Sequence, residues 1–217
     1  MSNPMKITAI ALAGGKSSRM GSDKALLEIK GETLLSRTSH IALLVADSVY
    51  IVARSQQQYQ HLTTNHLKSI HLVVDKKLDG ALMGFWQGIQ AIANSPPDWL
   101  LLLACDLPNI QSDILQTWAS QLDNLPQTAI AYLPHHVESD SNQSRKQWEP
   151  LCGFYRWQCQ ASLAEVIEKG ERSFQKWLDT QEVVEIPYVP LDMLFNCNTP
   201  HDFLKAVQSK SQSSSLL

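Results

Sequence analysis

The sequence predicts an α/β fold of three layers, in which a mainly parallel, doubly wound sheet carries helices on both faces. Apolar, strand-like runs alternate with polar, helix-like segments along the chain, a rhythm typical of βαβ units. The leucine run at 100–103 has no polar alternation, which indicates a strand buried on both faces. The length of 217 residues fits a single α/β domain better than two.

The first 134 residues contain five expected strands with helices between them. The strand-like runs are rich in β-branched residues or leucine and are bounded by breakers. They cover residues 6–12, 47–53, 70–75, 98–105 and 128–134. The helix candidates between them cover residues 34–46, 56–66, 83–93 and 113–122.

The pattern changes after residue 134, because residues 135–147 are polar and lack hydrophobic periodicity. A strand, two helices and another strand are expected next, at 148–156, 158–169, 173–180 and 182–189. A last helix begins after Thr199, which is a good N-cap, with Pro200 at its first position. The Ser-rich residues 209–217 are predicted to be disordered, so the single domain covers 1–208.

Composition excludes several classes of partner. The formal net charge of −3 argues against non-specific binding to nucleic acid or to a membrane surface. No apolar run approaches the roughly eighteen residues of a membrane helix, and the first residues lack a signal-peptide core. The four cysteines contain no CxxC pair and are expected to be reduced. We therefore expect a cytoplasmic protein with no nucleic-acid or membrane partner.

A glycine-rich loop, "LAGGKSSRMGSDK" at 12–24, follows the first expected strand. Ligands of open α/β sheets bind outside the carboxyl ends of the strands, so this loop lies where a ligand is expected. Gly14 and Gly15 let the backbone approach a phosphate closely and offer N–H groups to it. Arg19 and Lys24 add the positive charge that a triphosphate needs. The loop is predicted to bind phosphate.

Spacing excludes two common types of phosphate-binding loop. Gly15 and Gly21 have five residues between them, whereas a Walker A loop has four, followed by Lys and Ser or Thr. The dinucleotide-binding pattern G-x-G-x-x-G also fails, since Gly14 and Gly15 are adjacent. The residues alone leave a general phosphate-binding loop.

Asp106 is the strongest catalytic candidate. It follows the run "LLLLAC" at the mouth of a central buried strand, where an unpaired charge would be costly. A Mg²⁺ ion would satisfy it, because Mg²⁺ binds through one or two carboxylates together with substrate phosphates. The structural alternative is a helix cap near Asp113.

Four motifs then indicate a family, and the likeness covers almost all of residues 7–208. "LAGGKSSRMGSDKALLEI" at 12–29 resembles the signature of the nucleotidyltransferases that make dinucleotide forms of the molybdenum cofactor, above all the guanylyltransferases. "CDLP" (105–108) and "FNCNTPHDF" (195–203) resemble further motifs of that family. "EPLCGFYR" (149–156) does too, with Glu149 in place of the usual histidine.

The resemblance implies a Rossmann-like nucleotidyltransferase fold, with a nucleotide-binding half at about 6–125 and an acceptor-binding half at about 126–208. It implies that Asp106 binds both the metal and the nucleotide, and that Arg19 and Lys24 act on the phosphates in catalysis. The expected GTP-binding residues are Leu12, Ala13, Gly14, Gly15, Lys24, Asp75 and Asp106.

Three further assignments are less direct. Asp79 is a rival to Asp75, because the register within "DKKLDGALMG" is open. Asn198 is a candidate for the acceptor side. Some family members bind the nucleotide through an asparagine after the second strand, but this sequence reads "IVARSQ" there, so Arg54 inherits no such role.

The implied reaction is transfer of GMP from GTP to Mo-molybdopterin, with Mg²⁺ on Asp106 and Mn²⁺ as a possible replacement. Other cofactor-biosynthesis proteins and molybdoenzyme apoproteins are the implied protein partners. One alternative is a related transferase that uses CTP, or whose acceptor is a sugar or isoprenoid phosphate. Another is a non-catalytic carrier of nucleotide or pterin.

Overall fold

Seven strands form one sheet, with the order β11-β7-β10-β6-β1-β4-β5. The computed structural model describes residues 4–13, 23–55, 59–60, 69–136, 147–190 and 192–212. Every pairing in this sheet is parallel except those of β10 with β6 and β7. The mainly parallel sheet is therefore confirmed. Its strands are β1 (Ile7–Leu12), β4 (Ser48–Ala53), β5 (Ile70–Val74), β6 (Trp99–Ala104), β7 (Ala131–Leu133), β10 (Cys152–Arg156) and β11 (Val183–Glu185).

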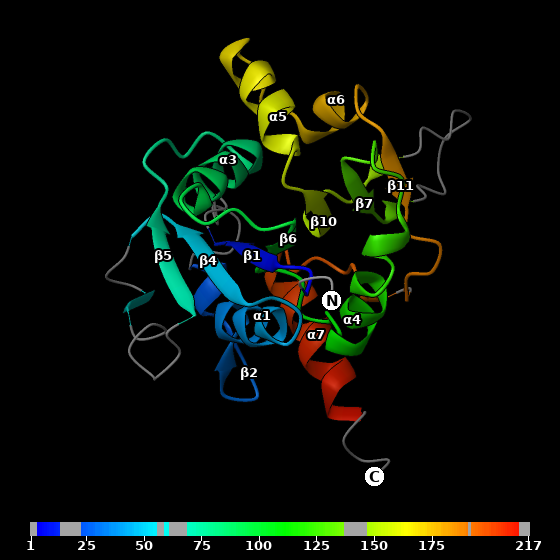
Figure 1. Ribbon diagram of the computed structural model, residues 1–217. Coiled ribbons are helices and arrows are strands. Elements are labelled where there is room, and N and C mark those ends of the chain that lie inside the picture. The colour runs from blue at the N-terminus through cyan, green and yellow to red at the C-terminus, as the bar shows by residue number, and fades with distance from the viewer. Residues whose placement is uncertain are drawn as a thin grey trace, which may run out of the picture.

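Helices cover both faces of this sheet, as Figure 1 shows. Helices α3, α5 and α6 lie on one face, and α1 and α4 lie on the other. This is the expected three-layer arrangement. The bounds are α1 (Leu34–Leu43), α3 (Ala81–Ile92), α4 (Ser112–Ala119), α5 (Cys159–Glu168), α6 (Phe174–Leu178) and α7 (Pro200–Gln212), with 3-10 turns η1 (Lys24–Leu26) and η2 (Leu122–Asn124). Most of the helix expected at 56–66 lies outside the described residues.

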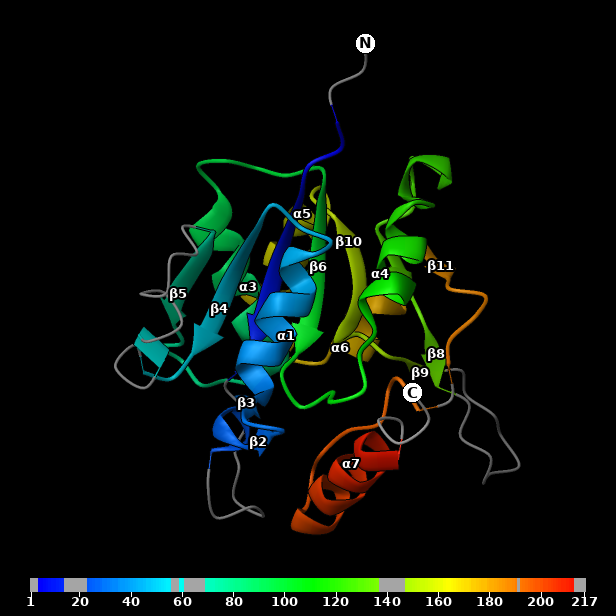
Figure 2. The same ribbon diagram turned by 90° about the horizontal axis from the view of Figure 1, so that it is seen from below.

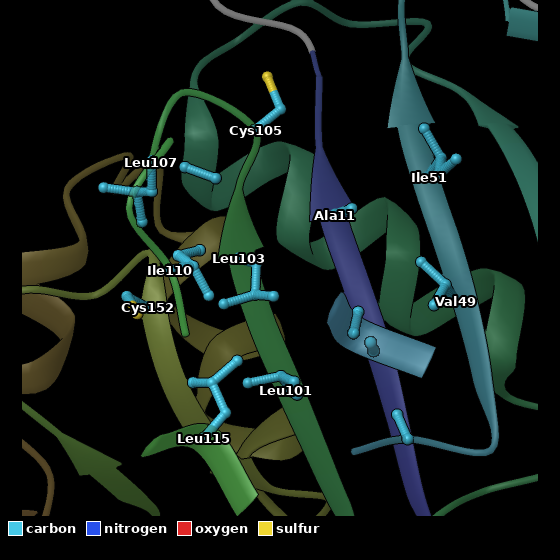
Figure 3. Packing of buried hydrophobic residues seen from close by; sticks show 14 of the residues in the cluster. Ala11, Val49, Ile51, Leu101, Leu103, Cys105, Leu107, Ile110, Leu115 and Cys152 are labelled. Atoms are coloured by element: carbon cyan, nitrogen blue, oxygen red, sulfur yellow. The ribbon is translucent and has the colours of Figure 1, made fainter. Parts of the chain in front are cut away.

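The leucine run of β6 explains why two cores form. Leu101 and Leu103 pack with Val49 and Ile51 on the α1 side (Figure 3). Leu100 and Leu102 point the other way and belong to the opposite core. All the leucines at 100–103 have an exposed fraction of 0%. Burying each leucine side chain contributes about 1.5–3 kcal/mol, so this strand anchors both layers.

Two short hairpins were not predicted from the sequence. Strands β2 (Glu28–Ile29) and β3 (Glu32–Thr33) are joined by Lys30 and Gly31, whose φ angles are 55° and 79°. Positive φ at both central residues is what a tight two-residue hairpin turn requires. Thr33 then caps α1, since its hydroxyl accepts a hydrogen bond from Ser36 N at 3.1 Å.

Prolines shorten three of the expected strands. Strand β7 ends before Pro134, β11 ends shortly before Pro187, and Pro150 precedes β10. Proline lacks the N–H that a sheet ladder uses. The residues expected to begin the strand at 148 instead form β9 (Gln147–Trp148), which pairs with β8 (His135–His136) in a separate hairpin.

The end of the chain departs from the sequence prediction. Helix α7 runs to Gln212, so residues 209–212 are helical rather than disordered; residues 213–217 lie outside the described part. A helix that has already formed extends at low cost per residue. α7 packs on the β2–β3 hairpin through a small core of Ile29, Leu34, Cys197 and Ala206, at the lower edge of the view in Figure 2.

Within the described residues, no helix is both long enough and apolar enough to cross a membrane. The four cysteines are free and buried. Cys105 and Cys152 both belong to the core on the α1 side (Figure 3). These thiols pack as small apolar side chains.

Candidate functional site

A cavity of about 490 Å³ opens where strands β1, β4, β5 and β6 end. These four strands are parallel, so their carboxyl ends meet at one edge of the sheet. Hydrogen bonds just beyond the strands hold this edge together. Cys105 N donates to Leu12 O at 3.2 Å, and Asp75 N donates to Ala53 O at 2.7 Å. The position agrees with the general rule for ligands of open α/β sheets.

Five residues predicted from the sequence line this cavity, namely Leu12, Ala13, Lys24, Asp75 and Asp106. They come from positions up to about ninety residues apart, and only the parallel sheet brings them together. Gly14, Gly15 and Arg19 lie outside the described residues, so their assignments stay predictions.

Asp106 and Lys24 lie close to each other in the lining of the cavity. Lys24 Nζ lies 3.7 Å from Asp106 Oδ2, and the two side chains are 16% and 23% exposed, respectively. Burial raises the pKa of the Asp106 carboxyl above its ordinary value, while the Lys24 cation and hydrogen bonds act in the opposite direction. A carboxylate at this position is therefore poorly solvated, and a positive ligand would stabilise it.

Asn198 is also brought to this site, from the other end of the chain. Its Oδ1 accepts a hydrogen bond from Lys24 Nζ at 2.7 Å. The neighbouring backbone is tied to the same place, because Cys197 N donates to Asp106 O at 2.9 Å. Asn196 instead contacts its own segment, through Leu194 O at 3.3 Å.

Thr199 caps α7, as the sequence predicted. Its hydroxyl accepts a hydrogen bond from Asp202 N at 3.2 Å. The carboxylate of Asp202 returns the contact and accepts from Thr199 N at 2.8 Å. Such reciprocal bonding is a capping arrangement that fixes the first turn of a helix. It fixes the segment that carries Asn198, whose side chain contacts Lys24.

Asp75 and Asp79 both line the cavity, so the choice between them stays open. Oδ1 of Asp75 accepts hydrogen bonds from Leu78 N at 2.9 Å and from Gln87 Nε2 at 2.6 Å. These bonds shape the turn after β5. Asp79 lies further along that turn, and its Oδ2 accepts from Arg172 Nε at 2.5 Å.

Three residues at the site were missed by the sequence analysis. Arg54 follows β4 directly and lines the cavity beside Asp23. The position of Arg54 after a strand end was a usable signal. Asp23 stands next to Lys24 in the loop motif. Tyr59, whose hydroxyl donates to Asp23 Oδ2, had no such signal because the contact depends on the fold.

The residues present fit a Mg²⁺ ion shared with a nucleotide. Among the described residues there is no cluster of three or more His, Cys, Asp or Glu side chains that could hold a metal alone. Asp106 presents a single, largely buried carboxylate beside the cavity. Mg²⁺ commonly takes one or two carboxylates and completes its shell with phosphate oxygens and water. The carboxylate of Asp106 at this cavity supplies the protein ligand that such a site needs.

The sequence is similar to a family of transferases over most of its length. The model of the MobA-like NTP transferase domain matches residues 9–184. A probable molybdenum cofactor guanylyltransferase of Nostoc sp. is 46% identical over 196 residues, which cover 90% of this chain and 88% of the relative. A protein of the same name from Synechococcus elongatus is 40% identical, and the match covers 92% and 97%.

Solved structures with the same fold include proteins of different named functions. Molybdopterin-guanine dinucleotide biosynthesis protein A from Archaeoglobus fulgidus has a TM-score of 0.71 at 20% identity, covering 94% of this chain and 99% of that one. The 4-diphosphocytidyl-2C-methyl-D-erythritol synthase of Anaerococcus prevotii has a TM-score of 0.72 at 13% identity, covering 95% and 96%. At these identities the likeness establishes the fold alone.

Proposed function

The chain belongs to the family of MobA-like NTP transferase domains, and from this we propose that it transfers GMP from GTP to Mo-molybdopterin. The products are molybdopterin guanine dinucleotide and pyrophosphate. Relatives at 40–46% identity over about nine-tenths of the chain are named probable molybdenum cofactor guanylyltransferases. The observation that carries the proposal is the pair formed by Asp106 and Lys24 at the cavity.

The reaction needs positioning and charge stabilisation rather than a covalent intermediate. An oxygen of the terminal phosphate of the pterin forms a bond to the α-phosphorus of GTP. The bond from that phosphorus to the bridging oxygen of the β-phosphate breaks, and pyrophosphate leaves with the electron pair. Lys24 stabilises the negative charge that develops on the leaving group. Arg19, from the same loop motif, is proposed to share this role.

The nucleotide is proposed to lie along the edge formed by β1, β4, β5 and β6. Backbone groups of the segment that begins at Leu12 and Ala13 and continues through Gly14 and Gly15 approach its phosphates. Asp75 or Asp79, which both line the same cavity, contacts the nucleoside.

Asp106 is proposed to hold Mg²⁺, with Mn²⁺ as a possible replacement. When bound there, the ion supplies positive charge for the phosphates of GTP. Asp106 itself supplies the carboxylate oxygen, and Lys24 contacts the phosphates. Burial of the carboxylate disfavours its charge, so metal binding is expected to stabilise this edge of the sheet.

Asn198 is proposed to mark the acceptor side. Its contact with Lys24 and its origin in the second half of the chain support this assignment. Other cofactor-biosynthesis proteins and apo-molybdoenzymes are proposed as partners that supply the acceptor or receive the product. We place the reaction in the cytoplasm, where reduced cysteines persist.

The test is a panel of nucleotides. Pyrophosphate release is measured from GTP, CTP and ATP, each with Mg²⁺ and molybdopterin. Release from GTP alone, dependent on molybdopterin, supports the proposal. Release from CTP, or with a sugar or isoprenoid phosphate as acceptor, would assign the protein to a different transferase activity. Binding of GTP or pterin without pyrophosphate release would indicate a carrier.

A further inference from the structure

We propose that Tyr59 is a positioning residue, which holds Lys24 in place through Asp23 and never contacts the substrate. The inference deepens the proposed function and rests on it, because it concerns the lysine that is proposed to act on the phosphates of GTP. Nothing in the motif around Lys24 indicates this role, since Tyr59 lies 36 residues away from Asp23.

Asp23 connects the two residues through its carboxylate. Oδ2 accepts the hydroxyl hydrogen of Tyr59. Oδ1 accepts a hydrogen bond from Ala25 N at 3.1 Å. This second bond caps η1, the turn that begins with Lys24. The backbone on both sides of Lys24 is therefore fixed by one carboxylate, whose other oxygen is held by the tyrosine.

Tyr59 is itself firmly anchored. Its side chain is 1% exposed and belongs to the same core cluster as Ala13, Ala25 and Cys105. Burial and the adjacent Asp23 carboxylate raise the pKa of the Tyr59 hydroxyl above its ordinary value. The hydroxyl thus keeps its proton at neutral pH and remains a donor to Asp23. The hydrogen bond from Tyr59 to Asp23 therefore links the turn η1 to the hydrophobic core.

The position of the turn matters because of what lies at the end of the lysine side chain. Lys24 Nζ lies 2.7 Å from Asn198 Oδ1 and 3.7 Å from Asp106 Oδ2. Lysine has a long, flexible stem and its ammonium acts as a point charge. Its effect on a departing pyrophosphate depends on where its backbone is held, since misplacement by about 1 Å can cost up to a hundredfold in rate.

The test is a double-mutant cycle between Tyr59→Phe and Lys24→Ala. The phenylalanine keeps the buried ring and removes only the hydroxyl. The kcat and KM for GTP are measured from pyrophosphate release, and the Kd for GTP with Mg²⁺ is measured by calorimetry. We expect Tyr59→Phe to lower kcat/KM about ten- to a hundredfold in the wild-type background. In the Lys24→Ala background, Tyr59→Phe should change kcat/KM less than about twofold, because the lysine through which Tyr59 acts is gone.

Tyr155→Phe is the matched control. Tyr155 is equally buried, and its hydroxyl donates to Pro150 O at 2.7 Å, but neither residue lines the cavity. Tyr155→Phe should change kcat/KM by the same small factor in the wild-type and Lys24→Ala backgrounds. An equal loss from Tyr59→Phe in both backgrounds would overturn the proposal, because it would show that the hydroxyl serves general stability only.

Asp23 gives a second line of evidence if Tyr59→Phe folds poorly. Asp23→Asn keeps an acceptor oxygen for only one of the two contacts, whereas Asp23→Ala removes both. We expect Asp23→Asn to lower kcat/KM less than Asp23→Ala does, and Asp23→Ala to lower it at least as much as Tyr59→Phe does. Equal activity of these two Asp23 variants would contradict the role.

The cycle in GTP affinity separates this inference from the proposed function. If the wild type binds GTP but releases no pyrophosphate, the proposed function fails. The Kd for GTP then tests the inference, which requires that Tyr59→Phe weaken GTP binding in the wild type but not in Lys24→Ala. If the wild type is active and no coupling appears in either kcat/KM or Kd, the inference fails and the proposed function stands.

Discussion

Lys24 and Asn198 are hydrogen-bonded, with Nζ 2.7 Å from Oδ1, although 174 positions separate them in the sequence. The contact joins the two ends of the chain at the cavity. It is held on one side by the turn η1 and on the other by the capped start of α7. The proposed catalytic lysine is therefore positioned by residues from both halves of the molecule.

The first prediction concerns this contact. Asn198→Ala should lower kcat/KM for the transfer about tenfold, because hydrogen bonds to charged groups are worth about 1.5–3 kcal/mol. Steady-state pyrophosphate release checks it. Asn109→Ala is the control, since Asn109 Nδ2 bonds to Asp192 O at 3.1 Å whereas Asn198 bonds to Lys24. Equal losses in the two variants would contradict a role of Asn198 at the site.

The second prediction concerns the metal carboxylate. Asp106→Asn should lower kcat at least a hundredfold, because the amide cannot supply a charged ligand oxygen. Circular dichroism and thermal unfolding should show an intact fold. The control is Asp113→Asn in the first turn of α4, which should keep full activity. Turnover that survives in Asp106→Asn and still rises with Mg²⁺ would show that the metal is bound elsewhere.

Much of this fold could be predicted because its signals are local. The leucines at 100–103 indicated a strand buried on both faces, and they are fully buried. The hairpin at Lys30–Gly31 and the proline-shortened strands were missed because apolar runs were weighed above turn chemistry. Asp106 was predicted from its place after a buried strand, and Lys24 as a basic residue of the glycine-rich loop. The role of Tyr59 could not be found, since its partner is set by tertiary packing.

The third prediction concerns Arg54, which follows β4 and lines the cavity. Its guanidinium should contribute positive charge to nucleotide binding. Arg54→Ala should weaken GTP binding about tenfold, and Arg54→Lys should recover part of the loss. Calorimetry at several salt concentrations checks both. Lys169→Ala is the control, because its partner is Glu165 on the outer surface of α5. Unchanged affinity in Arg54→Ala would remove Arg54 from the site.

The fourth prediction follows from a buried thiol. Burial and the nearby Glu149 raise the pKa of Cys152 from 9.0 to about 12. Between these values the unfolded chain loses the thiol proton while the folded protein keeps it, so the free energy of unfolding falls as pH rises above about 9. Urea unfolding of wild type and Cys152→Ala between pH 8 and 10.5 measures this. The difference in the free energy of unfolding between the wild type and Cys152→Ala should shrink as pH rises. A difference that stays constant would contradict this prediction.

The last prediction compares two glycines under the same substitution. A Cβ on Gly153 would lie 2.6 Å from Leu133 Cδ2 and 2.8 Å from the backbone oxygen of Tyr132. Since the backbone oxygen cannot rotate away, Gly153→Ala should lower the free energy of unfolding by about 1–3 kcal/mol.

Gly84→Ala is the matched comparison, because its Cβ would meet Leu12 Cδ2 at an ordinary 3.4 Å. Alanine is better than glycine in a helix by about 1 kcal/mol, so this variant should be as stable as the wild type or more so. Gly84 lines the cavity, and its methyl group should weaken GTP binding instead. Urea unfolding and GTP calorimetry on both variants therefore separate a residue needed for packing β10 from one needed for space at the site. If Gly153→Ala proved as stable as Gly84→Ala, the close packing between β10 and β7 would have to be looser than the structure shows.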